Sequence, residues 1–299
     1  MSLTLADRLF IALQHLIPQR WLSERMYRLA RVRWRPLKRF IIRHFARIYR
    51  IDMSLALEPD LDAYPHFNAF FTRALKPDAR PLDPDPAAIL CPVDGAISQI
   101  GVIEAGRLIQ AKGRDYSVES LLALAPGEPH PFEGGRFATI YLSPRDYHRI
   151  HMPLDGRLDQ MVHVPGQLFS VNAVTAAGVP DLFARNERLV CRFETEAGPM
   201  ALILVGAIFV GGIETVWAGE VTPPHSGLEP KRWDYEVDEQ CVRLERGEEM
   251  GRFNLGSTVI LLLPPGQAEW ESGLAPGDGV RLGQRLGIWR ETGAAGQGH

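Results

Sequence analysis

Residues 253–265 read Phe253-Asn254-Leu255-Gly256-Ser257-Thr258-Val259-Ile260-Leu261-Leu262-Leu263-Pro264-Pro265. The apolar run from Val259 to Leu263, closed by two prolines, has the pattern of a short buried β-strand. Directly before it, Gly256 precedes Ser257, whose hydroxyl is a nucleophile. Glycine adopts backbone angles that other residues avoid, so the Gly256–Ser257 peptide can sit in a strained bend that is open to attack. Taken alone, however, a Gly-Ser pair more often only begins a strand.

The chain changes character near residue 89, and this change predicts an α+β fold. Short strand-like runs separated by Gly and Asp cover residues 89–93, 95–100, 107–111, 137–142, 157–164, 189–193 and 200–210. One helix is expected at residues 117–124, with Ser117 as its N-cap. We expect N-terminal amphipathic helices followed by a body that is a β-sandwich or a distorted barrel. The predicted division is a helical region at 1–75, a proline-rich linker at 76–88 and a β-rich catalytic domain at 89–299.

The first fifty residues carry most of the positive charge. They hold twelve Lys/Arg and two acidic residues, a net charge of +10, against −3 for the whole chain. Apolar periodicity predicts helices at about 5–17, 21–34 and 37–50, and a short aromatic helix at 64–75. The second helix is rich in arginine, and in the third the basic residues, Lys38 among them, lie opposite the apolar stripe. Basic amphipathic helices can lie in an anionic membrane interface. The alternatives are a helical hairpin that packs on the core with its arginines in water, and a nucleic-acid arm, although no nucleic-acid-binding module follows.

Composition excludes several classes of protein. The longest apolar run, residues 200–213, is too short to cross a bilayer, and no secretory signal fits because Asp7 and Arg8 interrupt the first apolar stretch. The three cysteines, Cys91, Cys191 and Cys241, are far apart and indicate a reducing compartment. The strand-Gly-strand pattern after residue 89 is also typical of lipoyl- and biotinyl-carrier domains, but Lys112 lacks their acceptor context.

Upstream of Ser257, an aspartate and two histidines stand in distinctive stretches. Asp94 lies in Pro92-Val93-Asp94-Gly95, a sequence in which Asp is an ordinary turn residue. His148 and His151 lie between Pro144 and Pro153, where a loop is expected. A His-x-x-His pair can be half of a metal site, but no further ligand stands at metal spacing, so no metal is expected. Asp, His and Ser together match the residues of a relay triad, in which a base activates the hydroxyl and an acid orients the base.

Several segments resemble the bacterial phosphatidylserine decarboxylase proenzymes, a pyruvoyl-dependent family. Leu255-Gly256-Ser257-Thr258 is similar to their self-cleavage motif, and nearly the whole chain takes part in the resemblance. The other matching segments, in the family's order, are Phe67-Asn68-Ala69-Phe70-Phe71-Thr72-Arg73, Pro92-Val93-Asp94-Gly95, residues 141–153, Phe183-Ala184-Arg185-Asn186-Glu187-Arg188 and Glu214-Thr215-Val216-Trp217-Ala218-Gly219.

The resemblance implies a self-cleaving enzyme. It assigns the relay to Asp94, His151 and Ser257, with scission between Gly256 and Ser257 into a β chain of residues 1–256 and an α chain of residues 257–299. Ser257 becomes the pyruvoyl cofactor, a covalent pyruvate, which forms a Schiff base with phosphatidylserine and releases CO2 to give phosphatidylethanolamine. His148 is expected to assist decarboxylation or protonation.

The same resemblance places other parts of the molecule. Phe169, Ser170 and Asn172 are expected to line the substrate pocket. The family also implies a homodimer. From the basic helices, in contrast, we expect peripheral attachment to the cytoplasmic side of the cell membrane through anionic phospholipid, and no binding of nucleic acid is expected because no binding module follows these helices.

Three other functions remain open from the sequence. The nearest is a pyruvoyl-dependent decarboxylase of a soluble amino acid. A conventional serine hydrolase would use the same residue types, although Gly-x-Ser-x-Gly is absent around Ser257. A non-catalytic membrane scaffold would need only the basic helices and would leave the histidines and Ser257 unexplained.

Overall fold

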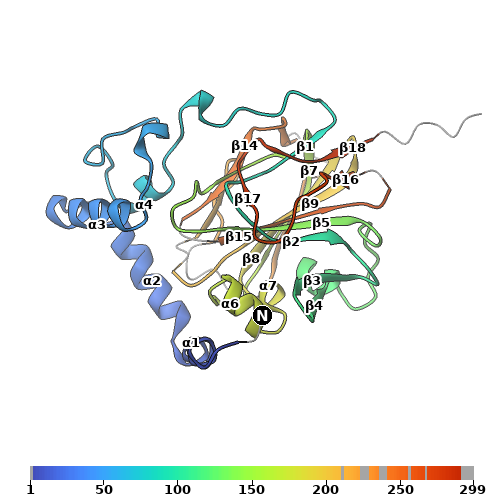
Figure 1. The fold of residues 1–299 in the computed structure, drawn as a ribbon, viewed down its shortest axis with the longest axis horizontal. Coiled ribbons are helices and arrows are strands. Elements are labelled where there is room, and N and C mark those ends of the chain that lie inside the picture. Colours follow the sequence, from blue (N-terminus) through green and yellow to red (C-terminus); the bar gives the residue numbers. More distant parts are fainter. Residues whose placement is uncertain are drawn as a thin grey trace, which may run out of the picture.

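The computed structural model describes residues 3–209, 212–222, 229–235, 241–254, 257–266 and 268–290. Three helices at the N-terminus lie on one side of a body built mainly of strands (Figure 1). Every pair of named strands among the described residues is antiparallel. The expected α+β class, with helices preceding a β-rich body, is confirmed, and the sheets of the described residues do not close into a barrel.

The N-terminal helices are α1 (Leu5–Leu16), α2 (Gln19–Ala30) and α3 (Arg35–Ile48). Thr4 caps α1, because its hydroxyl accepts from Asp7 N while the Asp7 carboxylate accepts from Thr4 N. The later short helices are η1 (Met53–Leu55), α4 (Phe67–Phe71), η2 (Pro77–Ala79), α5 (Val118–Leu122), α6 (Ala173–Gly178) and α7 (Leu182–Arg185). The helix expected at 64–75 is therefore much shorter, whereas the predicted Ser117 cap of α5 is confirmed.

A nine-stranded sheet forms the centre of the body. Its order is β12 (Lys231–Asp234), β7 (Gly156–Val164), β8 (Arg188–Thr195), β9 (Gly198–Val205), β15 (Ser257–Leu263), β5 (Arg136–Leu142), β2 (Gly95–Val102) and β17 (Gly279–Val280), with β13 (Arg243–Leu244) also paired to β7. The run predicted as a buried strand is β15, which lies between β9 and β5 and is buried throughout.

Smaller sheets complete the body. One consists of β1 (Ala88–Leu90), β18 (Arg285–Trp289) and β16 (Ala268–Trp270); another of β11 (Gly219–Glu220), β10 (Ile213–Thr215), β14 (Glu249–Phe253) and β6 (Arg149–His151); the last is the hairpin β3 (Arg107–Ala111) and β4 (Arg114–Ser117). The strand predicted at 200–210 ends at Val205. The expected loop around the two histidines is partly wrong, because β14 supplies a pairing partner that makes Arg149–His151 a strand.

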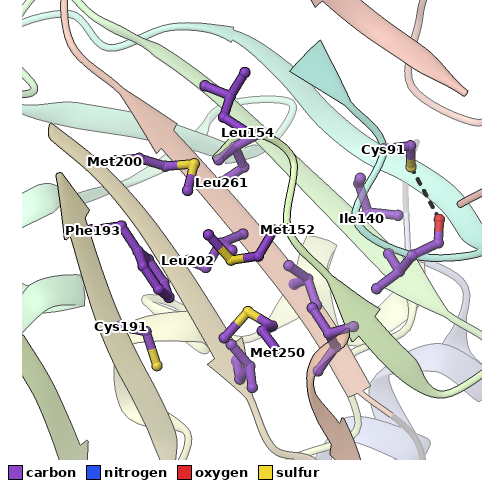
Figure 2. Close-up of a cluster of buried hydrophobic side chains, with 14 of the residues drawn as sticks. Cys91, Ile140, Met152, Leu154, Cys191, Phe193, Met200, Leu202, Met250 and Leu261 are labelled. Atoms are coloured by element: carbon purple, nitrogen blue, oxygen red, sulfur yellow. Dashed lines mark hydrogen bonds between the residues drawn. The ribbon is translucent and has the colours of Figure 1, made fainter. Parts of the chain in front are cut away.

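The side chains of β15 alternate between two hydrophobic cores. Val259, Leu261 and Leu263 belong to one core, which the smaller sheets close with residues such as Ile89 and Leu286. Figure 2 shows part of this core, including buried Cys91, whose thiol donates to the Val93 carbonyl at 3.0 Å. Ile260 and Leu262 face the second core, formed with α5–α7 and the β3–β4 hairpin. Both faces of the central sheet are thus covered, which explains why β15 is apolar at every position.

The N-terminal helices leave large apolar side chains exposed. Leu5, Leu9 and Leu16 of α1 are 74%, 63% and 80% exposed, and Trp34 before α3 is 66% exposed. The apolar stripe expected on α3 is only partly buried, because Ile42 lies inside while Phe40 and Ile48 face outward. Lys38, expected on the basic side of this helix, is instead buried and donates to the carbonyls of residues 62 and 64.

No helix in the described part of the chain is long and apolar enough to cross a membrane.

Candidate active site

Ser257 is the first residue of β15 and is fully buried. Its strand partner is Leu142, at the end of β5, so the hydroxyl lies where the loop toward the two histidines begins. Among the described residues, no group forms a hydrogen bond with Ser257 Oγ. Gly256 and Leu255 lie outside the described residues, so the strained bend before Ser257 stays a prediction.

The chain ahead of Ser257 is held by two asparagines. Asn254 is buried; its backbone N–H donates to the Gly212 carbonyl at 2.9 Å, and its side-chain oxygen accepts from Asn68 Nδ2 at 3.0 Å. Asn68 belongs to α4, far away in the sequence, so the aromatic segment that contains it fixes the approach to residue 257.

His148 is fully buried beside this segment. Its carbonyl accepts from Phe253 N at 3.0 Å, and its ring stacks on Phe71 with centroids 4.1 Å apart. Nε2 lies 3.1 Å from the Ser143 carbonyl oxygen, so Nε2 carries the proton and donates, whereas Nδ1 has no partner among the described residues. Burial, with the nearby Arg73 charge as a second cause, lowers the pKa of His148 to about 3. The imidazole is therefore neutral at pH 7.

This burial predicts a loss of stability in mild acid. Because the folded-state pKa lies below that of the unfolded chain, unfolding takes up a proton as the pH falls below about 6.5. Lowering the pH from 7 to 5 should therefore reduce the free energy of unfolding by about 2 kcal/mol through this histidine alone. Urea unfolding at both pH values should therefore show a smaller acid-induced loss in His148→Gln than in the parent chain. An equal loss in the two proteins would contradict a neutral buried His148.

His151 ends β6, and its ring is held at both nitrogens. Nδ1 lies 2.8 Å from the Gly247 carbonyl oxygen and therefore donates to it. Nε2 lies 3.3 Å from the Tyr147 hydroxyl and can accept its proton. Burial lowers the pKa of His151, while the negative charges of Glu249 and Asp94 act in the opposite direction. His151 thus presents a basic Nε2 whose orientation is set by a backbone carbonyl.

Asp94 lies near His151 but is bound to an arginine. The backbone N–H of His151 donates to the Pro92 carbonyl at 2.9 Å, which places the two segments side by side. The Asp94 carboxylate accepts from Nε of Arg80 at 2.7 Å and from Nη2 of the same guanidinium, and Leu282 N donates to it at 2.9 Å. The described residues contain no hydrogen bond between Asp94 and His151, so the expected acid–base contact is absent from this conformation.

A glycine allows this arrangement. A Cβ at Gly95 would lie 2.4 Å from the Tyr141 carbonyl oxygen, so a larger residue after Asp94 would push β2 away from β5. The Gly in the Pro-Val-Asp-Gly sequence is therefore required by the close approach of two strands.

An apolar cavity of about 380 Å³ reaches Ser257. Phe10, Leu13 and Ile17 of the α1 segment line it, together with Ser170 and Phe209. Ser170 and Ser257 thus line the same cavity, and the role of Ser170 in binding substrate stays a prediction.

The other two expected pocket residues lie elsewhere. Phe169 lines a neighbouring cavity of about 880 Å³ between α1, α2 and residues 166–169. Asn172 is not among the residues that line either cavity; its side chain caps α6 by accepting from Val174 N and Thr175 N.

Sequence patterns assigned no individual role to several residues that the structure places here. Tyr147 and Arg73 lie inside segments that had been singled out, but only as parts of a motif. Arg80 stands in the proline-rich stretch before the body, where no pattern indicates a partner for Asp94. Gly247 acts through its backbone carbonyl, which no side-chain motif records.

Comparison with known proteins gives this geometry a context. A family model described as phosphatidylserine decarboxylase matches residues 67–288, and a second, described as PSD, matches residues 9–50. The chain belongs to the phosphatidylserine decarboxylase family. A relative from Azotobacter vinelandii is 58% identical over 282 residues, which cover 94% of this chain and 98% of the relative. Relatives from Pseudomonas putida and Pseudomonas fluorescens are 57% and 58% identical over 94% of the chain and 97% of their own lengths. All three are called phosphatidylserine decarboxylase proenzyme.

The family match includes every residue of the candidate active site. Asp94, His148, His151 and Ser257 all fall within residues 67–288, and the shorter match runs from within α1 to just past the end of α3. The predicted resemblance to phosphatidylserine decarboxylase proenzymes is confirmed.

Proposed function

We propose that the chain is a phosphatidylserine decarboxylase proenzyme that cleaves itself between Gly256 and Ser257. The observation that carries the proposal is the buried Ser257 hydroxyl, without a hydrogen-bond partner among the described residues, beside an apolar cavity in a chain of this family. An unpaired buried hydroxyl lowers the stability of a fold, so such a group beside a cavity supports a chemical role rather than a structural one.

His151 is the base in the proposed scission. Its Nε2 takes the Ser257 proton, and Oγ attacks the Gly256 carbonyl carbon, so that an ester replaces the amide. Loss of the Ser257 α-proton then breaks the ester C–O bond and releases residues 1–256 with a terminal carboxylate. Water hydrolyses the resulting dehydroalanine to ammonia and a pyruvoyl group at residue 257. Asp94 acts through its charge, which favours the imidazolium that His151 becomes.

The site fits a pyruvoyl group at residue 257. The group is built from Ser257 itself, and the cavity beside it is lined mainly by apolar side chains. When present, this group accepts the electrons that are released as CO2 leaves the substrate. His148 presents its unpartnered Nδ1 in a neutral ring; an anionic substrate nearby would raise the pKa of this ring and allow it to deliver a proton.

The proposed substrate is phosphatidylserine, and the product is phosphatidylethanolamine. The acyl chains would approach through the apolar cavity at α1 while the serine headgroup reaches residue 257. Purified protein incubated with phosphatidylserine in mixed micelles should release CO2 and form phosphatidylethanolamine. Comparable turnover of free serine, with no reaction on the lipid, would contradict this assignment.

We also propose peripheral attachment to the cytoplasmic face of the cell membrane. The exposed leucines of α1 and the excess of arginine in α1–α3 support it, because apolar and basic side chains together bind anionic interfaces. The homodimer implied by the family stays a proposal, and light scattering of the purified protein would measure the oligomeric state. The division of the chain into a helical region, a linker and a catalytic domain, with boundaries at 75/76 and 88/89, also stays a proposal.

The attachment predicts a specific loss of vesicle binding. Because one buried leucine contributes about 1.5–3 kcal/mol, Leu5→Ser combined with Leu16→Ser should weaken binding to phosphatidylglycerol vesicles at least about ten-fold. Co-sedimentation should also weaken with salt, since exposed charges are screened beyond about 8–10 Å. Val102→Ser, at a residue on β2 that is 38% exposed, is the control and should bind normally. Equal binding by the double variant and the control would exclude α1 as the contact.

A further inference from the structure

We propose that a second cavity, on the Arg80 side of Asp94, is a binding site for a phosphate group. The cavity has a volume of about 470 Å³ and lies between the end of α3, the residues before the body, and the loop that follows β5. Five arginines line it: Arg50, Arg73, Arg80, Arg145 and Arg281. These residues come from five separate segments of the chain, so the fold assembles the concentration of positive charge.

Arg73 is the residue that indicates a ligand. It is only 5% exposed, and neither Nε nor Nη1 has a hydrogen-bond partner among the described residues. Its Nη2 lies 3.5 Å from the Arg145 carbonyl oxygen, and its Cζ lies 5.6 Å from the Phe70 ring centroid. Burial lowers the pKa of Arg73, although a guanidinium stays charged at neutral pH. A buried charge without an anion is unfavourable, so a bound anion would stabilise this part of the fold.

The carboxylates around the cavity are already engaged. Asp94 is paired with Arg80, and one oxygen of Asp146 accepts from Ser143 N and Oγ, both at 2.7 Å. Asp52 is exposed and accepts from Ser54. Five arginines against three aspartates leave the lining with a net charge of +2.

A phosphate group matches this charge and geometry. A phosphate monoester carries about −1.5 to −2 charges at pH 7 and a lipid phosphodiester about −1, and the oxygens of both accept paired hydrogen bonds from a guanidinium fork. Arg50, which lines the cavity, follows shortly after Ile48 at the end of α3, and Ile48 is 69% exposed. If α1–α3 rest on a membrane, the cavity therefore lies close to the lipid surface, and a lipid headgroup can supply the phosphate. Free phosphate has the same chemistry. The site requires only the unsplit chain, and it does not depend on self-cleavage.

Thermal unfolding of the full-length Ser257→Ala chain tests the site without any contribution from scission. Inorganic phosphate, titrated against sodium chloride at equal ionic strength, should raise the melting temperature by about 2 °C or more near saturation. Arg73→Met should abolish this rise. Arg243→Met removes the same charge from an exposed position on β13 and should keep the rise. An equal rise in the Arg73 variant, or no rise in any variant, would overturn the proposal.

Two further measurements complete the test. If Arg73→Met does not fold, Arg50→Met tests the site instead, because Arg50 is exposed and its replacement should not disturb folding. This variant should need a phosphate concentration about three-fold or more higher for the half-maximal shift in melting temperature. An unchanged concentration would refute the site. Glycerophosphoglycerol carries a lipid phosphodiester without acyl chains. If glycerophosphoglycerol gives the half-maximal shift in melting temperature at a lower concentration than inorganic phosphate does, the site is assigned to a lipid headgroup. If inorganic phosphate needs the lower concentration, the site is assigned to free phosphate.

Discussion

The Ser257→Ala chain is expected to remain a single polypeptide and to have no decarboxylase activity, whereas the parent chain should split between residues 256 and 257 without added protease. The substitution removes the oxygen that attacks the Gly256 carbonyl, and no other group in the proposed reaction can replace it. Folding should be little affected, because Ser257 Oγ forms no hydrogen bond with the described residues and β15 keeps its pairing with β5 and β9.

Intact mass spectrometry measures this result. The parent should give a fragment of residues 257–299 without a free amine, which reacts with carbonyl reagents. Thr139→Val is the matched control, since it removes a buried hydroxyl from the neighbouring strand at the position opposite Ile260, and it should split normally. A parent chain that stays unbroken when freshly purified would remove the basis of the proposed mechanism.

The two histidines should differ in the step that they support. His151→Ala should leave the chain largely unsplit, because His151 holds a basic Nε2 toward Tyr147 and is the base proposed for Ser257. His148→Ala should split nearly normally but decarboxylate about 10²–10⁴-fold more slowly, the usual cost of losing a positioned acid or base. The first variant therefore tests formation of the active enzyme, and the second tests its turnover.

Fragment yield on denaturing gels and CO2 release, measured on both proteins, separate these effects. Asp94→Asn, which keeps the shape of the side chain, should slow splitting without abolishing it, since Gly247 already orients the His151 ring. Equal splitting defects in the two histidine variants would refute the division of labour. The same comparison would then favour a shared structural role for residues 144–153.

Local patterns in the sequence predicted the elements that local interactions specify. The run at 259–263 and the helices near residues 5, 21 and 37 follow from apolar periodicity, and Ser117 follows from capping chemistry. The three-residue strand that ends at His151 could not be predicted, because it exists only through its pairing with β14, about one hundred residues later in the chain.

The residues of the candidate site could be predicted from the sequence, but their contacts could not. Residue types and their order indicated Asp94, His148, His151 and Ser257, but the partners of these side chains depend on tertiary contacts. The relay residues predict that Asp94 contacts His151, whereas the fold places Arg80 against Asp94 and a backbone carbonyl against His151. An arginine in a proline-rich stretch carries no local signal of such a pairing.

The position of β15 determines what scission would do to the molecule. Residues 257–290 supply β15 inside the central sheet, β17 at its edge, and β16 and β18 in the sheet with β1. A break before residue 257 would thus leave both pieces interleaved, as in a nicked protein. The fragments should co-elute in native buffer and separate only in denaturant, so the mature enzyme would be a heterodimer that cannot be reconstituted by mixing two independently folded subunits.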